Sequence, residues 1–247
     1  MRTKKAWVLV HTKMFMYQGK SCLSAYVCRR DEKLRILTIS AHTDDAIITT
    51  GGTISRILEE GGQVFYVGLS IAEESVPEDF PKDAVEVETR LATKVLGIDP
   101  KKVYVKRFPV RRFHEYRQDI LDALINLRDN IRPDIVFTHA TDNIHQDHGV
   151  VNRESIRTFR SWCSIYGYDF PWDDLYGMKM NLFYQLEERH IKKKVEAVSC
   201  LKSQVAKKAS YLTEKYIRGL AIERGTRIRA KYAEAFEVIR GIRRNLQ

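Results

Sequence analysis

The sequence predicts an α/β fold: a Rossmann-like three-layer architecture in which helices cover both faces of a mainly parallel sheet, with a helical C-terminal part. Between residues 34 and 138, short runs rich in β-branched and aromatic side chains alternate with longer segments whose apolar residues recur at helical spacing. The chain has 247 residues, 44% of them hydrophobic, which is enough for one large core. Strands that alternate with helices indicate a parallel sheet with right-handed crossovers.

The first β-α-β unit is predicted over residues 34–69. Its strand at 34–40 leads into a helix from about 46 to 60, where two glycines stop it, and a second strand follows at 63–69. The later elements are predicted, in chain order, as helix 84–96, strand 103–107, helix 115–130, strand 134–138, a helix after residue 148, a loop rich in aromatic residues at 162–172, a strand at 181–186 and C-terminal helices.

Residues 34–247 are expected to form this single domain, and residues 1–33 an N-terminal extension that lies outside the repeating pattern. Basic residues open the extension, but His11 cuts its apolar stretch short, so we expect no signal peptide. No apolar run approaches the roughly 20 residues that span a bilayer. The four cysteines form no Cys-x-x-Cys pair, which argues against a disulfide framework and against a thiolate metal site. We therefore expect a cytoplasmic protein without a transmembrane segment.

The formal net charge of +10 fits a nucleic acid, an anionic membrane surface or an anionic small substrate. Much of the excess lies in the C-terminal third, where basic and apolar residues interleave at helical spacing, which favours solvated helix faces. No zinc-finger, RNP-type or basic-zipper pattern is present, so a nucleic-acid partner is not expected. A homo-oligomer is compatible with the sequence.

Two short polar clusters each follow an apolar run that is predicted to be a buried strand. One is Ala-His-Thr-Asp-Asp at residues 41–45, and the other is His-Gln-Asp-His at residues 145–148. In an open parallel α/β sheet, the loops after the carboxyl ends of the strands line the ligand crevice, so both clusters should open into the same place. Catalytic zinc takes three ligands from His and carboxylate side chains and keeps one position open for water. The sequence therefore predicts one metal site built from two strand ends.

Within the clusters, His42 and Asp45 are spaced to reach one ion from a strand-to-helix turn, and His148 can supply the third ligand. Asp44 then lies beside the ligands but remains free, where it can accept a proton from the water that the ion activates.

For His145, the expected task is to face the developing oxyanion or the leaving nitrogen, with Asp147 fixing the tautomer of its ring. Simpler interpretations exist for both clusters. The Asp44-Asp45 pair also suits a helix N-cap with a charge in the first turn, and the second cluster also suits a solvated turn. The glycines at 51 and 52 do not match a phosphate-binding loop, and we interpret them as places of close packing or substrate approach.

These residues resemble the PIG-L/LmbE family of zinc-dependent N-deacetylases, which act on N-acetylated amino sugars. The family motif A-H-P-D-D-E corresponds to residues 41–46, and H-x-D-H is intact at 145–148. The similarity covers most of residues 34–240. Shorter matches are Gly-Gly-Thr-Ile at 51–54, the stretch 88–97, Pro-Asp-Ile-Val-Phe at 133–137, Lys-Ser-Gln at 202–204 and Tyr-Ala-Glu-Ala-Phe at 232–236.

The resemblance implies an LmbE-like fold and a metal-dependent amidohydrolase that uses Zn²⁺ to activate water against the acetamido group of a sugar or sugar conjugate. Thr43 replaces the family's proline and Ala46 its glutamate, which predicts a looser turn and one missing partner of the ligands. Carried over by position, the resemblance implies zinc ligands at His42, Asp45 and His148, a general base at Asp44, and an oxyanion-facing pair at His145 and Asp147.

On the substrate side, Arg111 and Arg112 suit bidentate contacts to a phosphate or carboxylate, and His139 is close enough in sequence to line the pocket. An N-acetylated, anionic sugar of the kind found in nucleotide-sugar or surface-polysaccharide pathways is therefore the expected substrate. An exposed basic loop is the alternative for the arginines. For the chain as a whole, the alternatives are a non-catalytic sugar or nucleotide binder of the same fold and a basic nucleic-acid-binding protein.

Overall fold

A computed structural model of the protein describes residues 33–173 and 177–243. The centre of the domain is a seven-stranded sheet with the order β3-β2-β1-β4-β5-β7-β6. The first five strands are parallel, whereas β7 runs antiparallel to both of its neighbours. The strands are β1 Arg35–His42, β2 Gln63–Ser70, β3 Val103–Val105, β4 Ile135–His139, β5 Ser164–Tyr168, β6 Leu182–Leu186 and β7 Tyr232–Arg240.

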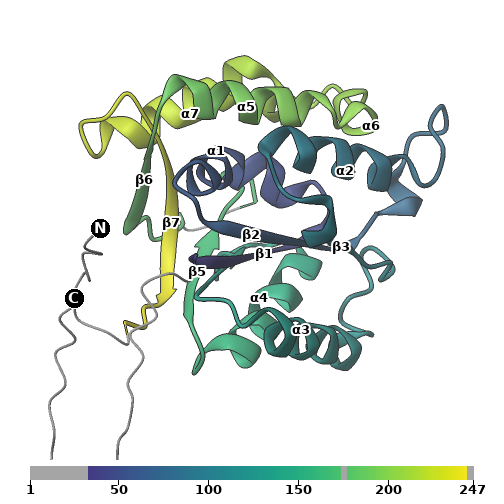
Figure 1. The fold of residues 1–247 in the computed structure, drawn as a ribbon. Helices are drawn as coiled ribbons and strands as arrows, with labels where there is room; N and C mark the ends of the chain where they lie inside the picture. The colour runs from purple at the N-terminus through teal and green to yellow at the C-terminus, as the bar shows by residue number, and fades with distance from the viewer. Residues whose placement is uncertain (1–32, 174–176, 244–247) are drawn as a thin grey trace, which may run out of the picture. The chain divides into compact units, whose positions relative to one another are not determined.

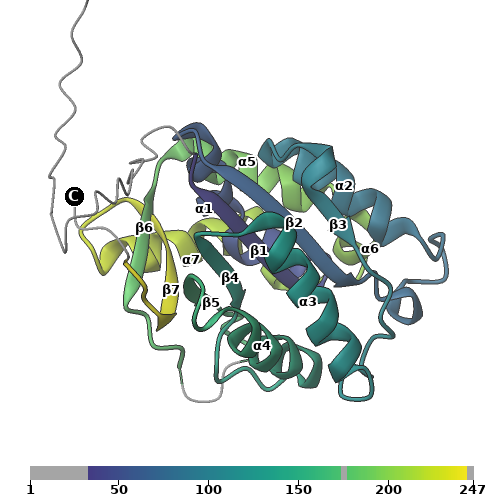
Figure 2. The same ribbon diagram turned by 60° about the horizontal axis from the view of Figure 1, so that its bottom comes forward.

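Helices cover both faces of the sheet, so the domain has the three layers that the sequence predicts (Figure 1). One face carries α1, α2, α5, α6 and α7, and the other carries α3 and α4, which lie side by side (Figure 2). The helices are α1 Asp45–Glu59, α2 Ala84–Leu96, α3 Arg117–Ile131, α4 Gln146–Phe159, α5 Glu188–Ser199, α6 Lys202–Val205 and α7 Glu214–Thr226, with short 3₁₀ turns at Glu73–Ser75, Pro100–Lys102 and Ser210–Leu212.

Each face has its own apolar core. On the face of α1 and α2, Ile36, Ile54 and Leu96 belong to a cluster of buried side chains, and on the other face Leu37 and Leu124 belong to a second one. Neighbouring residues of β1 therefore point to opposite faces, as the strand pleat requires. The buried residues of α3 recur at three- and four-residue spacing, which fixes the side of the helix that meets the sheet.

Two strands occur where the sequence did not predict them. β5 lies within the segment expected to be an aromatic loop. Its Gly167 packs so closely against the backbone just after β4 that an added Cβ would lie 2.8 Å from the Cα of Ala140. β7 follows the expected C-terminal helices. Glu234 and Glu237 interrupt the apolar pattern of β7, although both are buried. The sequence pattern therefore does not predict a strand here.

The two predicted clusters meet at one edge of the sheet. β1 and β4 are parallel neighbours, and they lie where the chain direction across the sheet reverses, because β2 and β3 extend from β1 on one side and β4 and β5 follow on the other (Figure 2). The loops after the carboxyl ends of such strands form the usual ligand crevice of α/β sheets. His42 ends β1, and residues 145–148 lie after β4 at the start of α4, so both clusters follow the carboxyl ends of neighbouring strands, as expected.

Inside α1, an ion pair from distant elements contacts the helix backbone. Glu234 of β7 accepts hydrogen bonds from the backbone N–H groups of Gly52 (3.0 Å) and Thr53 (2.7 Å), and Lys194 of α5 donates to the carbonyl oxygen of Thr49 (3.0 Å). The two charged groups are themselves 2.6 Å apart and buried. Glycine is needed at position 52, because an added Cβ would lie 2.9 Å from the carboxylate oxygen of Glu234. The glycines thus allow close packing, as expected, and Lys194 is not on a solvated helix face.

Residues 1–32 of the expected N-terminal extension, with Cys22 and Cys28, lie outside the described residues. Of the cysteines in the described ranges, Cys163 is buried and Cys200 is partly exposed. None of the described helices has the length and apolar character needed to cross a membrane.

Candidate metal centre and active site

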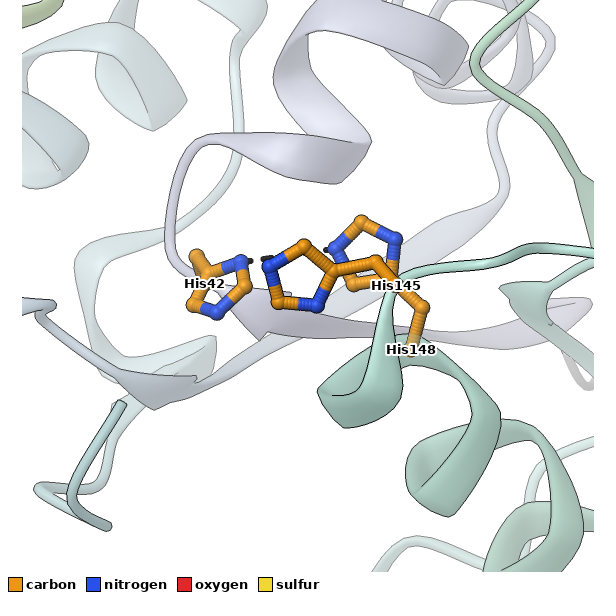
Figure 3. A group of neighbouring side chains, drawn as sticks. All are labelled: His42, His145 and His148. Atoms are coloured by element: carbon orange, nitrogen blue, oxygen red, sulfur yellow. Dashed lines mark hydrogen bonds between the residues drawn. The ribbon is translucent and has the colours of Figure 1, made fainter. Parts of the chain in front are cut away.

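Three side chains from β1, α1 and α4 converge on one point. The Nδ1 atom of His42, the Oδ2 atom of Asp45 and the Nε2 atom of His148 lie 3.4–3.5 Å from one another. Figure 3 shows how the imidazole rings of His42, His145 and His148 turn toward each other at the ends of β1 and α4. His145 with His42 and His148, and His139 with Asp45 and His148, form two further groups whose ligand atoms lie within 4.8 Å.

The spacing of the three atoms matches a zinc site. A tetrahedral ion with bonds of about 2.0–2.1 Å places its ligand atoms about 3.4 Å apart. His42, Asp45 and His148 have this spacing already, and two imidazoles with one carboxylate are a donor set that catalytic zinc accepts. The residues present therefore fit the metal that the family resemblance implies.

The electrostatics of this point favour a cation. Burial lowers the pKa of His42, but the charge of Asp45 and the hydrogen bond with Asp147 outweigh burial and raise that pKa to about 10. Burial raises the pKa of Asp45, yet the facing histidines hold it well below its usual value. The pKa of His148 is held well below its usual value by burial and by the neighbouring His139, which leaves its ring neutral, as metal ligation requires.

Each of the two candidate imidazole ligands has a partner on its far side. The Nε2 atom of His42 lies 3.1 Å from the carboxylate of Asp147, and the Nδ1 atom of His148 lies 3.0 Å from the side-chain oxygen of Asn143. An acceptor on the outer nitrogen fixes the tautomer that leaves the inner nitrogen free for a metal. Asn143 was missed in the sequence, because only its spacing to His148 could have indicated it.

The expected pairing of Asp147 with His145 is not what the structure shows. The Asp147 carboxylate contacts His42 and accepts the backbone N–H groups of Arg111 (2.6 Å) and Phe113 (3.3 Å). It is instead the backbone N–H of Asp147 that donates to the Nδ1 atom of His145, at 3.2 Å. Asp147 lies in the first turn of α4, so its N–H has no partner within the helix and is available for this bond.

The tautomer of His145 follows from that bond. Because Nδ1 accepts a hydrogen bond, the proton of the neutral ring is on Nε2. Burial and the nearby positive charge of His42 lower the pKa of His145, which favours the neutral ring. His145 therefore brings an N–H donor to the cavity that it lines.

Asp44 occupies the N-cap position of α1, but its side chain makes no capping hydrogen bond. The simpler interpretation of Asp44 as a helix cap is therefore not supported. Burial and the neighbouring charge of Asp45 raise the pKa of Asp44 to about 6. Its carboxylate lines the same cavity as His42, His145 and His148.

The cavity over this cluster measures about 280 Å³ and is also lined by Arg111, Lys207 and Trp172. The guanidinium of Arg111 hydrogen-bonds Ser75, and the ammonium of Lys207 hydrogen-bonds the side-chain oxygen of Gln204. Two basic side chains that contact neutral partners thus face a site rich in histidine and aspartate.

Two residues expected to contact the substrate lie elsewhere. Arg112 is outside the cavity lining and forms a surface ion pair with Glu115. His139 is fully buried beneath the site, where its ring stacks on His148 at 3.9 Å between centroids and its Nε2 atom lies 3.3 Å from Asp45. His139 therefore packs against two of the candidate ligands, His148 and Asp45, and does not line the cavity.

The turn after β1 is held at both ends despite the absence of proline. The N–H of Thr43 donates to the carbonyl of Ser70 at 3.1 Å, and the hydroxyl of Tyr66 donates to the carbonyl of Thr43 at 2.8 Å. A proline could not supply the first bond. Ala46 is fully buried within the apolar core, so the second departure affects packing beneath α1.

We expect that replacing Asn143 by Ala weakens zinc binding about 10- to 100-fold, because the outer partner of His148 is lost while the ligand itself remains. Competitive titration against a chromophoric zinc chelator measures this change. Asn126→Ala is the matched control, since Asn126 lies on the exposed surface of α3. Equal zinc affinity in the Asn143 and Asn126 variants would show that Asn143 does not orient His148.

Comparisons with known proteins match this chain to a family of deacetylases. Residues 37–159 match the family model "PIG-L: GlcNAc-PI de-N-acetylase", which spans both polar clusters. The chain is 27% identical over 185 residues to the uncharacterized deacetylase YaiS of Escherichia coli K12, covering 73% of this chain and 97% of that protein.

Solved structures share the fold. The N,N'-diacetylchitobiose deacetylase of Pyrococcus horikoshii superposes with a TM-score of 0.69 at 22% identity, over 85% of each chain. GalB of Pseudomonas putida KT2440, a 4-carboxy-2-hydroxymuconate hydratase, superposes with a TM-score of 0.67 at 20% identity, over 87% of this chain and 100% of that one. Since a hydratase shares the fold, the fold alone does not fix the reaction. The family match, which includes both polar clusters, does: this chain belongs to the PIG-L/LmbE-like family of deacetylases.

Proposed function

We propose that the protein is a zinc-dependent hydrolase that removes the N-acetyl group from an N-acetylated amino sugar, or a conjugate of one, that carries an anionic group. The observation that carries this proposal is the mutual spacing of 3.4–3.5 Å among the ligand atoms of His42, Asp45 and His148. Two further titratable groups, Asp44 and His145, line the same cavity. The family match supports the reaction class.

The three ligands hold the metal, and zinc bound there supplies Lewis-acid activation of water and of the amide carbonyl. Asp44 accepts the proton of the attacking water, since its carboxylate lines the cavity and makes no capping bond. His145 presents Nε2–H, which hydrogen-bonds the amide oxygen as negative charge develops there. The proton that Asp44 took from the water then passes from its carboxyl group to the leaving nitrogen as the C–N bond breaks. Asp147 orients His42 and fastens the loop that carries Arg111.

The anionic group of the substrate is assigned to the side of the cavity that holds Arg111 and Lys207. Both side chains line the cavity and form their hydrogen bonds with neutral groups, so their charges are available to a phosphate or carboxylate. Arg111 has a positive φ of 67°, a backbone conformation that is uncommon outside glycine, and its N–H bond to Asp147 holds it there.

Acetate release from a panel of N-acetylglucosamine compounds, free, nucleotide-linked and lipid-linked, tests the proposal. We expect release from an anionic member, with loss after chelation and recovery on adding zinc. His42→Ala should be inactive, and His114→Ala, a change at an exposed histidine, should be active. Binding without acetate release would indicate a sugar or nucleotide binder. A salt-dependent gel shift with nucleic acid, again without acetate release, would indicate a nucleic-acid-binding protein.

A further inference from the structure

A second, smaller cavity adjoins the candidate active site. The two cavities share a wall that consists of Ile48, Phe170, Trp172 and Tyr211. The aromatic rings of this wall pack on one another: Trp172 stacks on Tyr211 at 4.0 Å between centroids, and the ring centroids of Phe170 and Trp172 are 4.8 Å apart. A substrate in the active-site cavity therefore has the second cavity immediately beside it.

The buried ion pair of Lys194 and Glu234 also lines the second cavity. The hydrogen-bonding groups of this pair are already largely used within the protein. Both oxygens of Glu234 accept backbone N–H groups of α1, and Lys194 donates to Glu234 and to the carbonyl of Thr49. Their hydrogen bonds are directed into the protein.

The remaining lining is largely apolar. Ile217, Leu220 and Ala221 of α7 line the cavity together with Met178 and Ala233. Asp169, Tyr216 and Arg224 also line it, and the guanidinium of Arg224 forms an ion pair with Glu223 at 3.0 Å. Its volume of about 40 Å³ compares with the roughly 10–15 Å³ that one water needs, so the space suits about three to four non-hydrogen atoms. Apolar walls around so small a space favour a short hydrocarbon group over a sugar ring, whose hydroxyls would need hydrogen-bond partners.

We propose that this second cavity binds a short alkyl group of the substrate, of about three or four carbons, and so determines specificity beyond the acetamido group. The inference rests on the proposed function for the position of the sugar. Two sources of the alkyl group are chemically equivalent here: a longer N-acyl chain, or a substituent on the anomeric carbon.

The test uses zinc-loaded, full-length protein with Trp7→Phe and Trp162→Phe, which leaves Trp172 as the only tryptophan fluorophore. Fluorescence titration compares N-acetylglucosamine with N-butyrylglucosamine and with the α- and β-propyl glycosides of N-acetylglucosamine. We expect one of the alkyl probes to bind roughly 10- to 50-fold more tightly than N-acetylglucosamine, from the burial of two or three methylene groups. The butyryl and propyl probes distinguish the two sources.

Leu220→Phe in the same background fills the cavity from a partly exposed position, and Ile222→Phe is the matched control on the exposed side of α7. Leu220→Phe should abolish the gain of the alkyl probe and leave N-acetylglucosamine unaffected, whereas Ile222→Phe should change neither. An equal gain in both variants, or no gain in a parent that binds N-acetylglucosamine, would overturn the inference.

Xenon provides a sugar-independent measurement, since it enters small apolar cavities. Xenon-induced shifts of the Ile217 methyl signals, present in the parent and lost in Leu220→Phe, would support the cavity even if no sugar binds. That result would place the failure in the proposed substrate. Absence of xenon shifts together with absence of an alkyl gain would reject the second cavity as a binding site, whatever the outcome of the acetate assay.

Discussion

Asp44→Asn is expected to retain zinc and to lose about 10²- to 10⁴-fold in kcat, because the amide keeps the shape of the side chain but cannot accept the proton of the attacking water. Asp45→Asn, the adjacent change of the same type, should instead lose most of the metal, because it removes a charged ligand. Zinc content and kcat measured on both variants separate the two tasks. A near-normal kcat in Asp44→Asn, or equal metal loss in both variants, would contradict the assignment of the base.

The same assignment gives a pH dependence. Burial and Asp45 raise the pKa of Asp44 to about 6 in the metal-free site, and a bound dication lowers it from there. A base must be deprotonated to work, so activity should fall as the pH drops through this pKa, at or below about pH 6. In Asp44→Asn the acidic limb from this group should be absent from the residual rate.

Removing the charge of Glu234 is expected to cause the largest loss of stability. Glu234→Gln leaves the Lys194 charge unpaired in the core and weakens two bonds to the backbone of α1, and breaking one partner of such a pair costs about 3–5 kcal/mol. Glu60→Gln is the control, because its pair with Arg56 is largely solvent-exposed and is worth less than about 1 kcal/mol. Urea unfolding curves give both values, and a Glu234→Gln loss as small as the control's would show that the buried pair is not structurally important.

The prediction from sequence succeeded where local pattern and tertiary role agree. The strand at 34–40 and the helix at 84–96 have clear apolar periods, and their ends have glycine or polar punctuation, so the predicted and observed elements nearly coincide. The convergence of the two clusters could be predicted because parallel strands bring their carboxyl ends to one edge.

The prediction failed where distant contacts determine local structure. β7 contains two buried glutamates, whose partners come from α1, α5 and Thr141, and no local pattern reveals such partners. The same limit explains why the partner of the Asp147 carboxylate was predicted wrongly. Its carboxylate contacts His42, at the carboxyl end of β1, and the loop at Arg111. Both are distant in sequence, whereas the sequence pattern suggested the nearby residue His145 as the partner.

Zinc content of two variants within the second cluster tests the central claim most directly, namely that His42, Asp45 and His148 hold one zinc ion while His145 remains free for chemistry. The measurement is zinc per chain, by plasma mass spectrometry after exhaustive buffer exchange, in the wild type, His145→Ala and His148→Ala. We expect close to one zinc in the wild type and in His145→Ala, and close to none in His148→Ala, because a site of three ligands cannot lose one without a large loss of affinity. Full zinc in His148→Ala, or equal loss in both variants, would contradict this ligand set.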